Sequence, residues 1–388
     1  MVTKIPRRTV AIVAVMISAT VYTVVQGLTY PLLSLLLANR GVPEWEIGLN
    51  SAMMPVGMLI AAVIMPRIVA TVGLYRTCVV CLSGVSVCLS LIAIIDNHWL
   101  WAPLRLVTGV FLATIFIATD TWINNLAVEE YRGRTVGIYS MLLSIGFAVG
   151  PGILAITGAT SLVPFIVVVL LPLASLIPLI WARSVLPTAV GDRPSSIFRF
   201  FRHAPVLLLC VGVAAYVEQA AMSFLPLYGL LRNFSEGVSS TLLVAMIAGS
   251  VVLMYPIGWL ADRINRIALI VACAMLATVF SAMYFIQLGV VPALIVSFAW
   301  GGLYYGIYTL SLIWLGQRFT GSLLIAGTAA CSAVWGIGGL FGSPAVGASM
   351  QVHGAGGFAL GTAVALVFLV MVLLARQLLT RRTTTASK

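Results

Sequence analysis

Long runs of apolar residues, separated by short polar or charged breaks, recur along the whole chain. Each run reaches or exceeds the roughly 20 residues that a helix needs to cross a bilayer, and the longer runs fit if the helix tilts or extends into the interface. The pattern therefore predicts an all-α membrane protein with twelve transmembrane helices. The expected spans lie near residues 9–38, 45–70, 74–95, 99–127, 134–159, 161–183, 204–230, 237–261, 266–288, 291–316, 321–350 and 354–378.

Composition agrees with a membrane setting, because 61% of the 388 residues are hydrophobic and 8% are charged. Soluble domains carry far more charge. The formal net charge of +11 is spread over short loops, so we expect no nucleic-acid partner. The first apolar run is much longer than the apolar core of a cleaved signal peptide, and we expect it to remain as a span in the lipid bilayer.

The basic residues predict the orientation, since Lys and Arg are retained on the cytoplasmic side. With the N-terminus inside, Arg40 and Arg232 are the two cations expected outside, and Arg105 falls within a span. The other eighteen of the 21 basic residues fall in cytoplasmic segments. We therefore expect a multi-pass protein of the inner (plasma) membrane with both termini in the cytoplasm.

The chain also divides near its middle, where Pro, Gly, Ser and basic residues interrupt the apolar runs. The expected parts are an N-terminal six-helix half (1–183), a cytoplasmic linker (184–203) and a C-terminal six-helix half (204–388). A shift of 192 residues aligns the halves and places Arg40 on Arg232, Gly57 on Gly249 and Gln26 on Glu218. Two such halves resemble the plan of the major facilitator transporters, which implies a pseudo-symmetric fold with substrate bound between the halves.

A charged turn after the eighth span strengthens this resemblance. Residues 258–266 match the family's loop signature G-x-L-A-D-R-x-G-R except that Asn265 replaces a glycine. The resemblance implies a cytoplasmic latch, in which Asp262 engages a helix N-terminus and Gly258 lets helices approach closely. The predicted latch residues are Gly258, Asp262, Arg263 and Arg266. The copy in the first half has Ala70 in place of the acid.

The fifth span carries small residues at the spacing G-x8-G-x3-G-P. This spacing resembles a signature of the proton-coupled antiporters of the family, although the closing Gly-Gly is absent. Small residues at such intervals form a groove for a neighbouring helix, and a proline permits a bend. Generic close packing is the alternative interpretation. The residues are Gly137, Gly146, Gly150 and Pro151.

Two acidic residues, Asp120 and Glu218, lie well inside predicted spans. An ionised acid at the bilayer centre costs about 2.5–3.5 kcal/mol on insertion scales, so such groups usually face protein or water and serve a function. A carboxyl group there can exchange a proton. Glu218 lies about 21 Å into its helix by helical rise, and Asp120 lies closer to the cytoplasmic end of its span. We predict both as proton-coupling residues, with a structural hydrogen bond as the alternative for each.

Arg105 is the one cation that lies far from both ends of a predicted span. Together with Gly109 it resembles the R-x-x-x-G signature in the fourth helix of the family. A buried arginine keeps its proton and must be paired or solvated. About 22 Å of helix separate it from Asp120, so these two are not expected to pair. We predict that Arg105 tunes the pKa of another acid or binds an anionic group of the substrate.

Aromatic and amide side chains complete the candidate site. An aromatic wall beside an acid suits an apolar or cationic ligand, although lipid-facing or core packing is the alternative for each ring. Few amides occur within the spans, which disfavours polyol uptake. The residues expected beside Arg105 to contact substrate or tune a pKa are Gln26, Tyr30, Trp122, Gln219, Tyr304, Tyr308 and Trp335.

These features favour a secondary transporter that needs no cofactor besides a proton gradient and works as a monomer on a small-molecule substrate. No phosphate-binding G-x-x-x-x-G-K-[ST] is present, and no catalytic or metal-ligating cluster appears among the Cys and His residues. We expect neither an enzyme nor a channel. The main hypothesis is a proton-coupled exporter (antiporter) of a small amphiphilic or cationic compound, and the rival is a proton-coupled importer (symporter) of a small nutrient or carboxylate.

Overall fold

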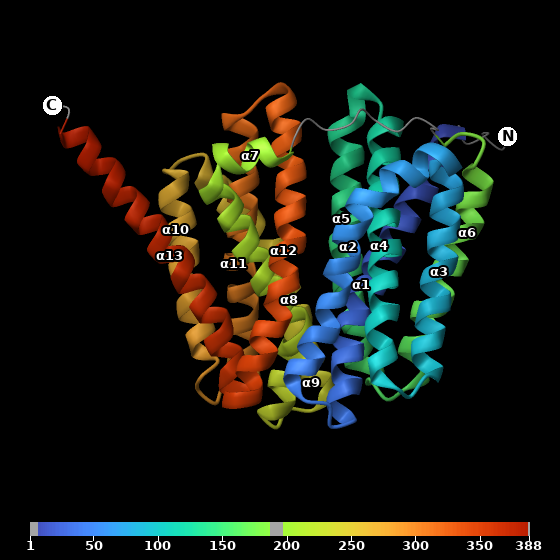
Figure 1. The fold of residues 1–388 in the computed structure, drawn as a ribbon, viewed down its shortest axis with the longest axis horizontal. Coiled ribbons are helices and arrows are strands. Elements are labelled where there is room, and N and C mark those ends of the chain that lie inside the picture. The colour runs from blue at the N-terminus through green and yellow to red at the C-terminus, as the bar shows by residue number, and fades with distance from the viewer. Residues whose placement is uncertain (1–6, 187–196, 387–388) are drawn as a thin grey trace. The chain divides into compact units, whose positions relative to one another are not determined.

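The computed structural model describes residues 7–186 and 197–386, and within these ranges the chain forms helices and no strands (Figure 1). Twelve of the described helices are long and apolar enough to cross a membrane, which confirms the predicted number. The helices are α1 (Arg7–Asn39), α2 (Glu44–Val72), α3 (Leu74–Ile94), α4 (His98–Leu126), the 3-10 helix η1 (Glu129–Tyr131), α5 (Arg132–Thr157), α6 (Leu162–Ala182), α7 (Ile197–His203), α8 (Pro205–Leu231), α9 (Glu236–Ala261), α10 (Arg266–Met283), α11 (Val290–Arg318), α12 (Gly321–His353) and α13 (Ala355–Ala386).

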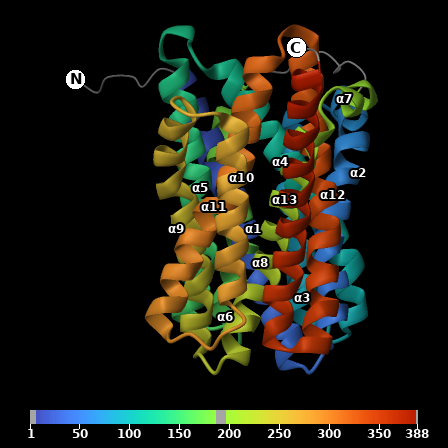
Figure 2. The same ribbon diagram turned by 90° about the vertical axis from the view of Figure 1, so that its left-hand side faces the viewer.

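The chain forms two compact units. Unit 1 takes Met1–Gly41 and Leu49–Arg193, and unit 2 takes Val42–Gly48 and Pro194–Lys388. In unit 1, α1 packs against α4, α5 and α6, and α3 packs against α4 and α6. In unit 2, α8 packs against α9, α11, α12 and α13, and α10 lies against α11 and α13 (Figure 2). The contacts of α1 with α4, α5 and α6 thus lie within unit 1, and those of α8 with α9, α11, α12 and α13 lie within unit 2.

The internal repeat is visible in the closest helix contact of each unit. A Cβ atom on Gly57 of α2 would collide with the carbonyl oxygen of Leu106 in α4. A shift of 192 residues converts this pair into Gly249 of α9 and Phe298 of α11, where a Cβ atom would collide with the carbonyl oxygen in the same way. Glycine at these positions lets two backbones touch, as at other crossings of membrane helices.

A second pair of glycines, on the partner helices α4 and α11 of these crossings, is related by the same shift of 192 residues. A Cβ atom on Gly109 of α4 would overlap the carbonyl oxygen of Met54, and one on Gly301 of α11 would overlap that of Met246. Both residue pairs differ by 192, like the first. The two units are therefore built on one helix-crossing geometry, in which each helix of the crossing supplies a glycine.

Gly301→Ala is expected to destabilise unit 2, because the added methyl group must displace the backbone of α9. Overpacking of this kind costs about 1–3 kcal/mol. Gly316→Ala is the matched control, since Gly316 lies on the same helix with open space around it. The control should be neutral or stabilise the protein by roughly 0.5–1 kcal/mol, because alanine favours helix. Thermal unfolding in detergent would measure both, and equal melting temperatures would refute the close crossing.

The two arginines paired by the repeat have the same structural role. Arg40 donates to the carbonyl oxygen of Asp96 (2.8 Å), just beyond the end of α3. Arg232 donates to the carbonyl oxygens of Tyr284 and Phe285 (both 2.8 Å), just beyond the end of α10. The last carbonyl groups of a helix have no partner within the helix. Each arginine donates hydrogen bonds to carbonyl groups that follow the end of a helix in its own unit.

The observed boundaries correct the predicted ones at two places. The ninth predicted span, 266–288, corresponds to α10, which ends at Met283, because the chain turns where Arg232 binds the carbonyl groups of Tyr284 and Phe285. The predicted linker, 184–203, contains the short helix α7 at its end, and its residues 187–196 lie outside the described part of the chain. This helix forms because Phe200 is fully buried against α8, α11 and α12, a tertiary contact that the local sequence does not reveal.

Candidate functional site

Glu218 lies near the middle of α8, and its side chain is half-buried within unit 2. Its carboxylate forms no ion pair with any basic residue in the described part of the chain. Three tyrosines of α11, Tyr304, Tyr305 and Tyr308, lie within electrostatic reach of it. The helix–helix contact of α8 with α11 brings them there. Tyr305 was not predicted, because it falls outside the four-residue spacing of the other aromatic residues.

The aromatic residues of α11 form a continuous row. The ring centroids are 5.5 Å apart between Trp300 and Tyr304, 6.3 Å between Tyr304 and Tyr305, and 5.4 Å between Tyr305 and Tyr308. Trp335 of α12 extends the row, 4.6 Å from Tyr308. Distances of this size and tilted ring planes are favourable for aromatic pairs. The row thus brings three of the predicted residues, Tyr304, Tyr308 and Trp335, together beside the acid.

The two ends of the row differ in burial. Trp300 and Tyr304 are buried, and Trp300 also packs edge-on against Tyr284 and Phe358. Tyr308 and Trp335 are half-buried. The Trp300 end is therefore core packing in this structure, while the other end retains exposed aromatic surface.

Gln219, next to Glu218, is also half-buried. Its side-chain nitrogen is shielded from solvent and has no hydrogen-bond partner among the described residues. The indole nitrogen of Trp300 is in the same situation. A buried donor without an acceptor costs about 1–3 kcal/mol. The side-chain N–H group of Gln219 is therefore a donor without an acceptor on α8, whereas that of Trp300 lies within the core packing of unit 2.

Arg105 lies on α4 in unit 1 and is fully buried, with 0% of its surface exposed. One terminal nitrogen, Nη1, donates to Oδ1 of Asn50 in α2 at 3.0 Å. The guanidinium carbon lies 5.7 Å from the ring centroid of Tyr30 in α1. Three helices thus position the guanidinium group. Asn50 was not predicted as a site residue, since a contact between residues 50 and 105 has no signal in the local sequence.

The charge of Arg105 is incompletely compensated. Its Nε and Nη2 atoms are buried and have no hydrogen-bond partner among the described residues. Arg105 also forms no ion pair with an acidic residue in the described part of the chain. A buried charge that loses its partner typically costs about 3–5 kcal/mol. A buried guanidinium without a counter-charge is therefore unfavourable for folding. Its two unpaired N–H groups form a potential binding position for an anion.

The other predicted residues of unit 1 lie apart from this group or in its packing. Asp120 is exposed on α4, and Tyr139 of α5 lies within electrostatic reach of it. Trp122 is fully buried and Gln26 of α1 is half-buried. Trp122 has no exposed surface in this structure, and its role in substrate contact or pKa tuning stays a prediction.

The turn at 258–266 differs in detail from the expected latch. A Cβ atom on Gly258 would meet nothing within 4 Å, so the described residues show no close helix approach at this glycine, and its role in the latch stays a prediction. Asp262 is the exposed C-cap residue of α9. Arg263 stacks on Trp259, with 3.7 Å between the guanidinium carbon and the ring centroid. Arg266 begins α10.

Asn265 caps α10, where the family signature has glycine. Its Oδ1 accepts hydrogen bonds from the backbone nitrogens of Ile267 (2.9 Å) and Ala268 (3.3 Å). Asparagine is among the preferred residues at this position of a helix. The departure from the family signature therefore has a local structural reason.

The small residues of the fifth span divide into two groups. Cβ atoms on Gly146 and Gly150 would collide with α1, the former with Thr23 and the latter with the backbone at Leu28. Pro151 is buried beside them. Gly137 has open space around it, so it takes no part in this crossing. The groove on α5 is thus occupied by α1 of the same unit.

The described residues contain no group of three or more His, Cys, Asp and Glu side chains able to hold a metal ion. All six cysteines are free and buried. Two charged groups well inside the spans form the candidate site, the carboxylate of Glu218 with its tyrosines and the guanidinium of Arg105.

Sequence comparison identifies relatives over most of the chain. The family model for the Major Facilitator Superfamily matches residues 15–319. The uncharacterized MFS-type transporter YfkF of Bacillus subtilis is 25% identical over 343 residues, which are 84% of this chain and 85% of the relative. The uncharacterized MFS-type transporter YcaD of Escherichia fergusonii is 22% identical over 327 residues, 83% of this chain and 84% of the relative.

Solved structures share the fold at low sequence identity. A bacterial homologue of the human lysosomal transporter Spinster has a TM-score of 0.77 and 12% identity, covering 96% of both chains. The nucleoside transporter NupG has a TM-score of 0.74 and 13% identity, covering 94% of this chain and 98% of its own. Likenesses at this identity establish the fold alone. With the family match over residues 15–319, they establish that the chain belongs to the Major Facilitator Superfamily and is a membrane transporter rather than an enzyme.

Proposed function

We propose that the protein is a proton-coupled antiporter that exports a small amphiphilic or cationic compound. The observation that carries the proposal is Glu218, a carboxylate inside a membrane-spanning helix that has no cationic partner among the described residues and lies beside the tyrosines of α11. Tyrosine rings attract cations through their π faces. A single carboxylate beside such rings provides one position for which a proton and an organic cation compete.

Competition for this carboxylate is sufficient for exchange. When the site opens to the cytoplasm, Glu218 releases its proton and the carboxylate binds the cationic group of the substrate. When the site opens to the acidic exterior, a proton binds the carboxylate and the substrate leaves. Alternating access requires that the protein changes conformation with either ligand bound but not with the empty, charged carboxylate. Each cycle then moves one proton inward for each substrate molecule outward.

The proposal also covers the membrane in which the protein lies and its oligomeric state. The positive-inside pattern places both termini in the cytoplasm and the protein in the inner (plasma) membrane. The chain works as a monomer, because its two units carry all the candidate groups, with Arg105 in unit 1 and Glu218 in unit 2.

Two measurements test this function. Thermal-shift screening would compare amphiphilic cations, with ethidium and tetraphenylphosphonium as probes, against the carboxylates succinate and benzoate. Efflux of the cation that binds would then be followed from cells or vesicles with an imposed pH gradient. The proposal requires that external acid stimulates outward movement. Stabilisation by carboxylates alone, with inward movement stimulated by external acid, would contradict it.

The second candidate function is import of a small carboxylate together with a proton. The observation that favours it is the environment of Arg105. Its buried guanidinium has two N–H groups without a partner among the described residues. Arginine binds a carboxylate through two parallel hydrogen bonds. A bound carboxylate would supply the counter-charge that the Arg105 guanidinium otherwise lacks.

For the turn at 258–266, we expect Asp262→Asn to shift the resting population toward the inward-open state. A neutral amide loses the attraction of an acid to a helix N-terminus, about 0.3–1 kcal/mol, which changes a two-state ratio by about two- to fivefold. Spin-label distances between the two units would report the shift. Asn265→Ala is the control, since it removes the cap of α10 but keeps the acid. Identical distance distributions for Asp262→Asn and the parent protein would exclude the latch.

A further inference from the structure

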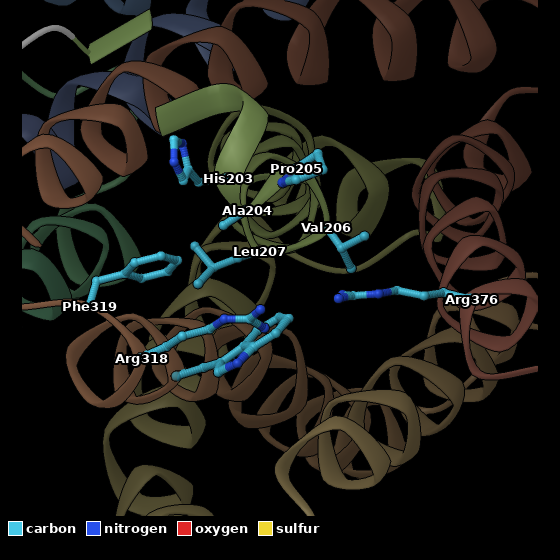
Figure 3. Close-up of a pocket in the computed structure, with 9 residues that line it drawn as sticks. His203, Ala204, Pro205, Val206, Leu207, Arg318, Phe319 and Arg376 are labelled. Carbon is cyan, nitrogen blue, oxygen red and sulfur yellow. The ribbon is translucent and has the colours of Figure 1, made fainter. Parts of the chain in front are cut away.

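A second polar site lies at one end of unit 2, away from Glu218. It is a cavity of about 120 Å³ formed where α8 begins and where α11 and α13 approach their ends. Figure 3 shows Arg318 of α11 and Arg376 of α13 extending toward the cavity from different sides, with His203 beside the start of α8. Sites for drug-sized ligands occupy about 300–1,000 Å³, so this cavity fits a smaller chemical group.

The side chains that line the cavity favour an anionic ligand. Arg318, Arg376 and His203 contribute basic nitrogen atoms, and none of the nine lining residues is acidic. The aromatic residues hold the arginines in place: the guanidinium carbon of Arg376 lies 5.6 Å from the ring centroid of Trp314, and that of Arg318 lies 6.0 Å from Phe319. Two guanidinium groups facing one small cavity match the oxygen atoms of a phosphate group.

The start of α8 adds to the positive electrostatic potential in the cavity. Residues 204–207 line the cavity, and α8 begins with Pro205 without a side-chain cap on its first turn. The positive end of a helix stabilises phosphate groups. The helix end thus supplements the two arginines rather than forming the site alone.

The cavity lies at the boundary of the membrane-spanning segments. The apolar span on α8 begins at Pro205, that on α11 ends at Arg318, and that on α13 ends at Gln377, next to Arg376. These ends lie on the side that we propose to be cytoplasmic. Basic pockets between helices at this level bind the headgroups of anionic lipids.

An apolar groove adjoins the cavity at Pro205. It has a volume of about 470 Å³ and shares Pro205 with the cavity. The groove is lined by residues of α7, α8, α12 and α13, including the exposed side chains of Ile337, Phe341 and Phe368. Exposed apolar side chains within a membrane-spanning segment contact acyl chains. The cationic cavity and the groove together match the two chemical parts of a phospholipid.

We propose that unit 2 binds one anionic phospholipid here, with its phosphate in the cavity between Arg318 and Arg376 and an acyl chain in the groove. The site is separate from the substrate and proton positions of the proposed function. It ties the ends of α11 and α13 to the start of α8 through the lipid phosphate.

Native mass spectrometry of the purified full-length protein tests the proposal by titration with phosphatidylglycerol and with phosphatidylcholine of the same acyl chains. We expect tighter binding of phosphatidylglycerol. Each of Arg318→Gln and Arg376→Gln should weaken it about fivefold, and the double variant about 25-fold. Arg202→Gln removes one exposed charge from α7 outside the cavity lining and should change binding less than twofold. Ile337→Trp, which fills the groove, should weaken both lipids.

Equal affinities for the two lipids, or equal effects of Arg202→Gln and the cavity variants, would overturn the proposal. Excess inorganic phosphate distinguishes the sources of the phosphate group. Failure of phosphate to displace phosphatidylglycerol supports the lipid, whereas one-for-one displacement would assign the cavity to free phosphate and overturn the lipid assignment. Because the readout is lipid binding, failure of transport by any variant does not affect the result.

Discussion

Glu218→Gln is expected to abolish the accumulation of ethidium that a pH gradient drives into inverted vesicles, while exchange between equal ethidium pools continues. Glutamine has nearly the shape of glutamate, and Gln26 occupies the repeat-related position in unit 1, so the substitution should fit the fold. The amide cannot take up or release the proton that the cycle exchanges. The carrier would then equilibrate its substrate without coupling, a loss of function much larger than any change in stability.

The matched control is Glu236→Gln, which removes one acid from the first turn of α9 in the same unit. It should retain accumulation. Binding of ethidium by purified Glu218→Gln, followed by thermal shift, separates lost coupling from lost binding. Full gradient-driven accumulation by Glu218→Gln would remove the proton-coupling assignment and leave Asp120 as the remaining acid inside a span.

Arg105→Met is expected to stabilise the protein while removing any transport of carboxylates. The guanidinium is fully buried, and Nη1 is its one nitrogen with a hydrogen bond to the described residues, at Asn50. Replacing buried charges by apolar side chains of similar volume is often neutral or stabilising by about 1–4 kcal/mol. A charged hydrogen bond contributes about 1.5–3 kcal/mol, so loss of two such bonds should weaken carboxylate binding by at least a hundredfold.

Two measurements on this variant distinguish the candidate functions. Unchanged ethidium export by Arg105→Met supports the antiporter of a cation, and abolished uptake of succinate supports the symporter. Arg105→Lys is the control, because it keeps the charge but not the paired N–H geometry. A lower melting temperature for Arg105→Met would show that the guanidinium is a net contributor to the fold, contrary to the expectation of an uncompensated buried charge.

The fold was predictable because membrane spans depend on one local property, the length of an apolar run. The same rule extended the ninth span too far, since residues 284–288 include further apolar side chains. The end of this helix, α10, is instead set by hydrogen bonds from Arg232 of another helix segment. The repeat was also readable: the shift that pairs Gly57 with Gly249 places both at equivalent crossings. Local pattern and simple periodicity therefore suffice for the framework.

The candidate site was predictable residue by residue but not as a set of contacts. Charge within an apolar span identified Glu218 and Arg105, because such groups are unfavourable there. Their neighbours depend on which helix faces are in contact. The bond from Arg105 to Asn50 and the approach of Tyr305 to Glu218 arise from packing between helices, and no spacing in the sequence encodes them. The cationic cavity around Arg318 and Arg376 was missed for the same reason.

The central claim, exchange of a cation for a proton, is tested most directly by proton movement in proteoliposomes. Vesicles containing the purified protein and the pH-sensitive dye pyranine would be given an inward ethidium gradient at equal internal and external pH. The account expects the interior to become alkaline as ethidium enters and protons leave, and no such change with Glu218→Gln. Acidification of the interior, or ethidium entry without proton movement in the parent protein, would contradict antiport.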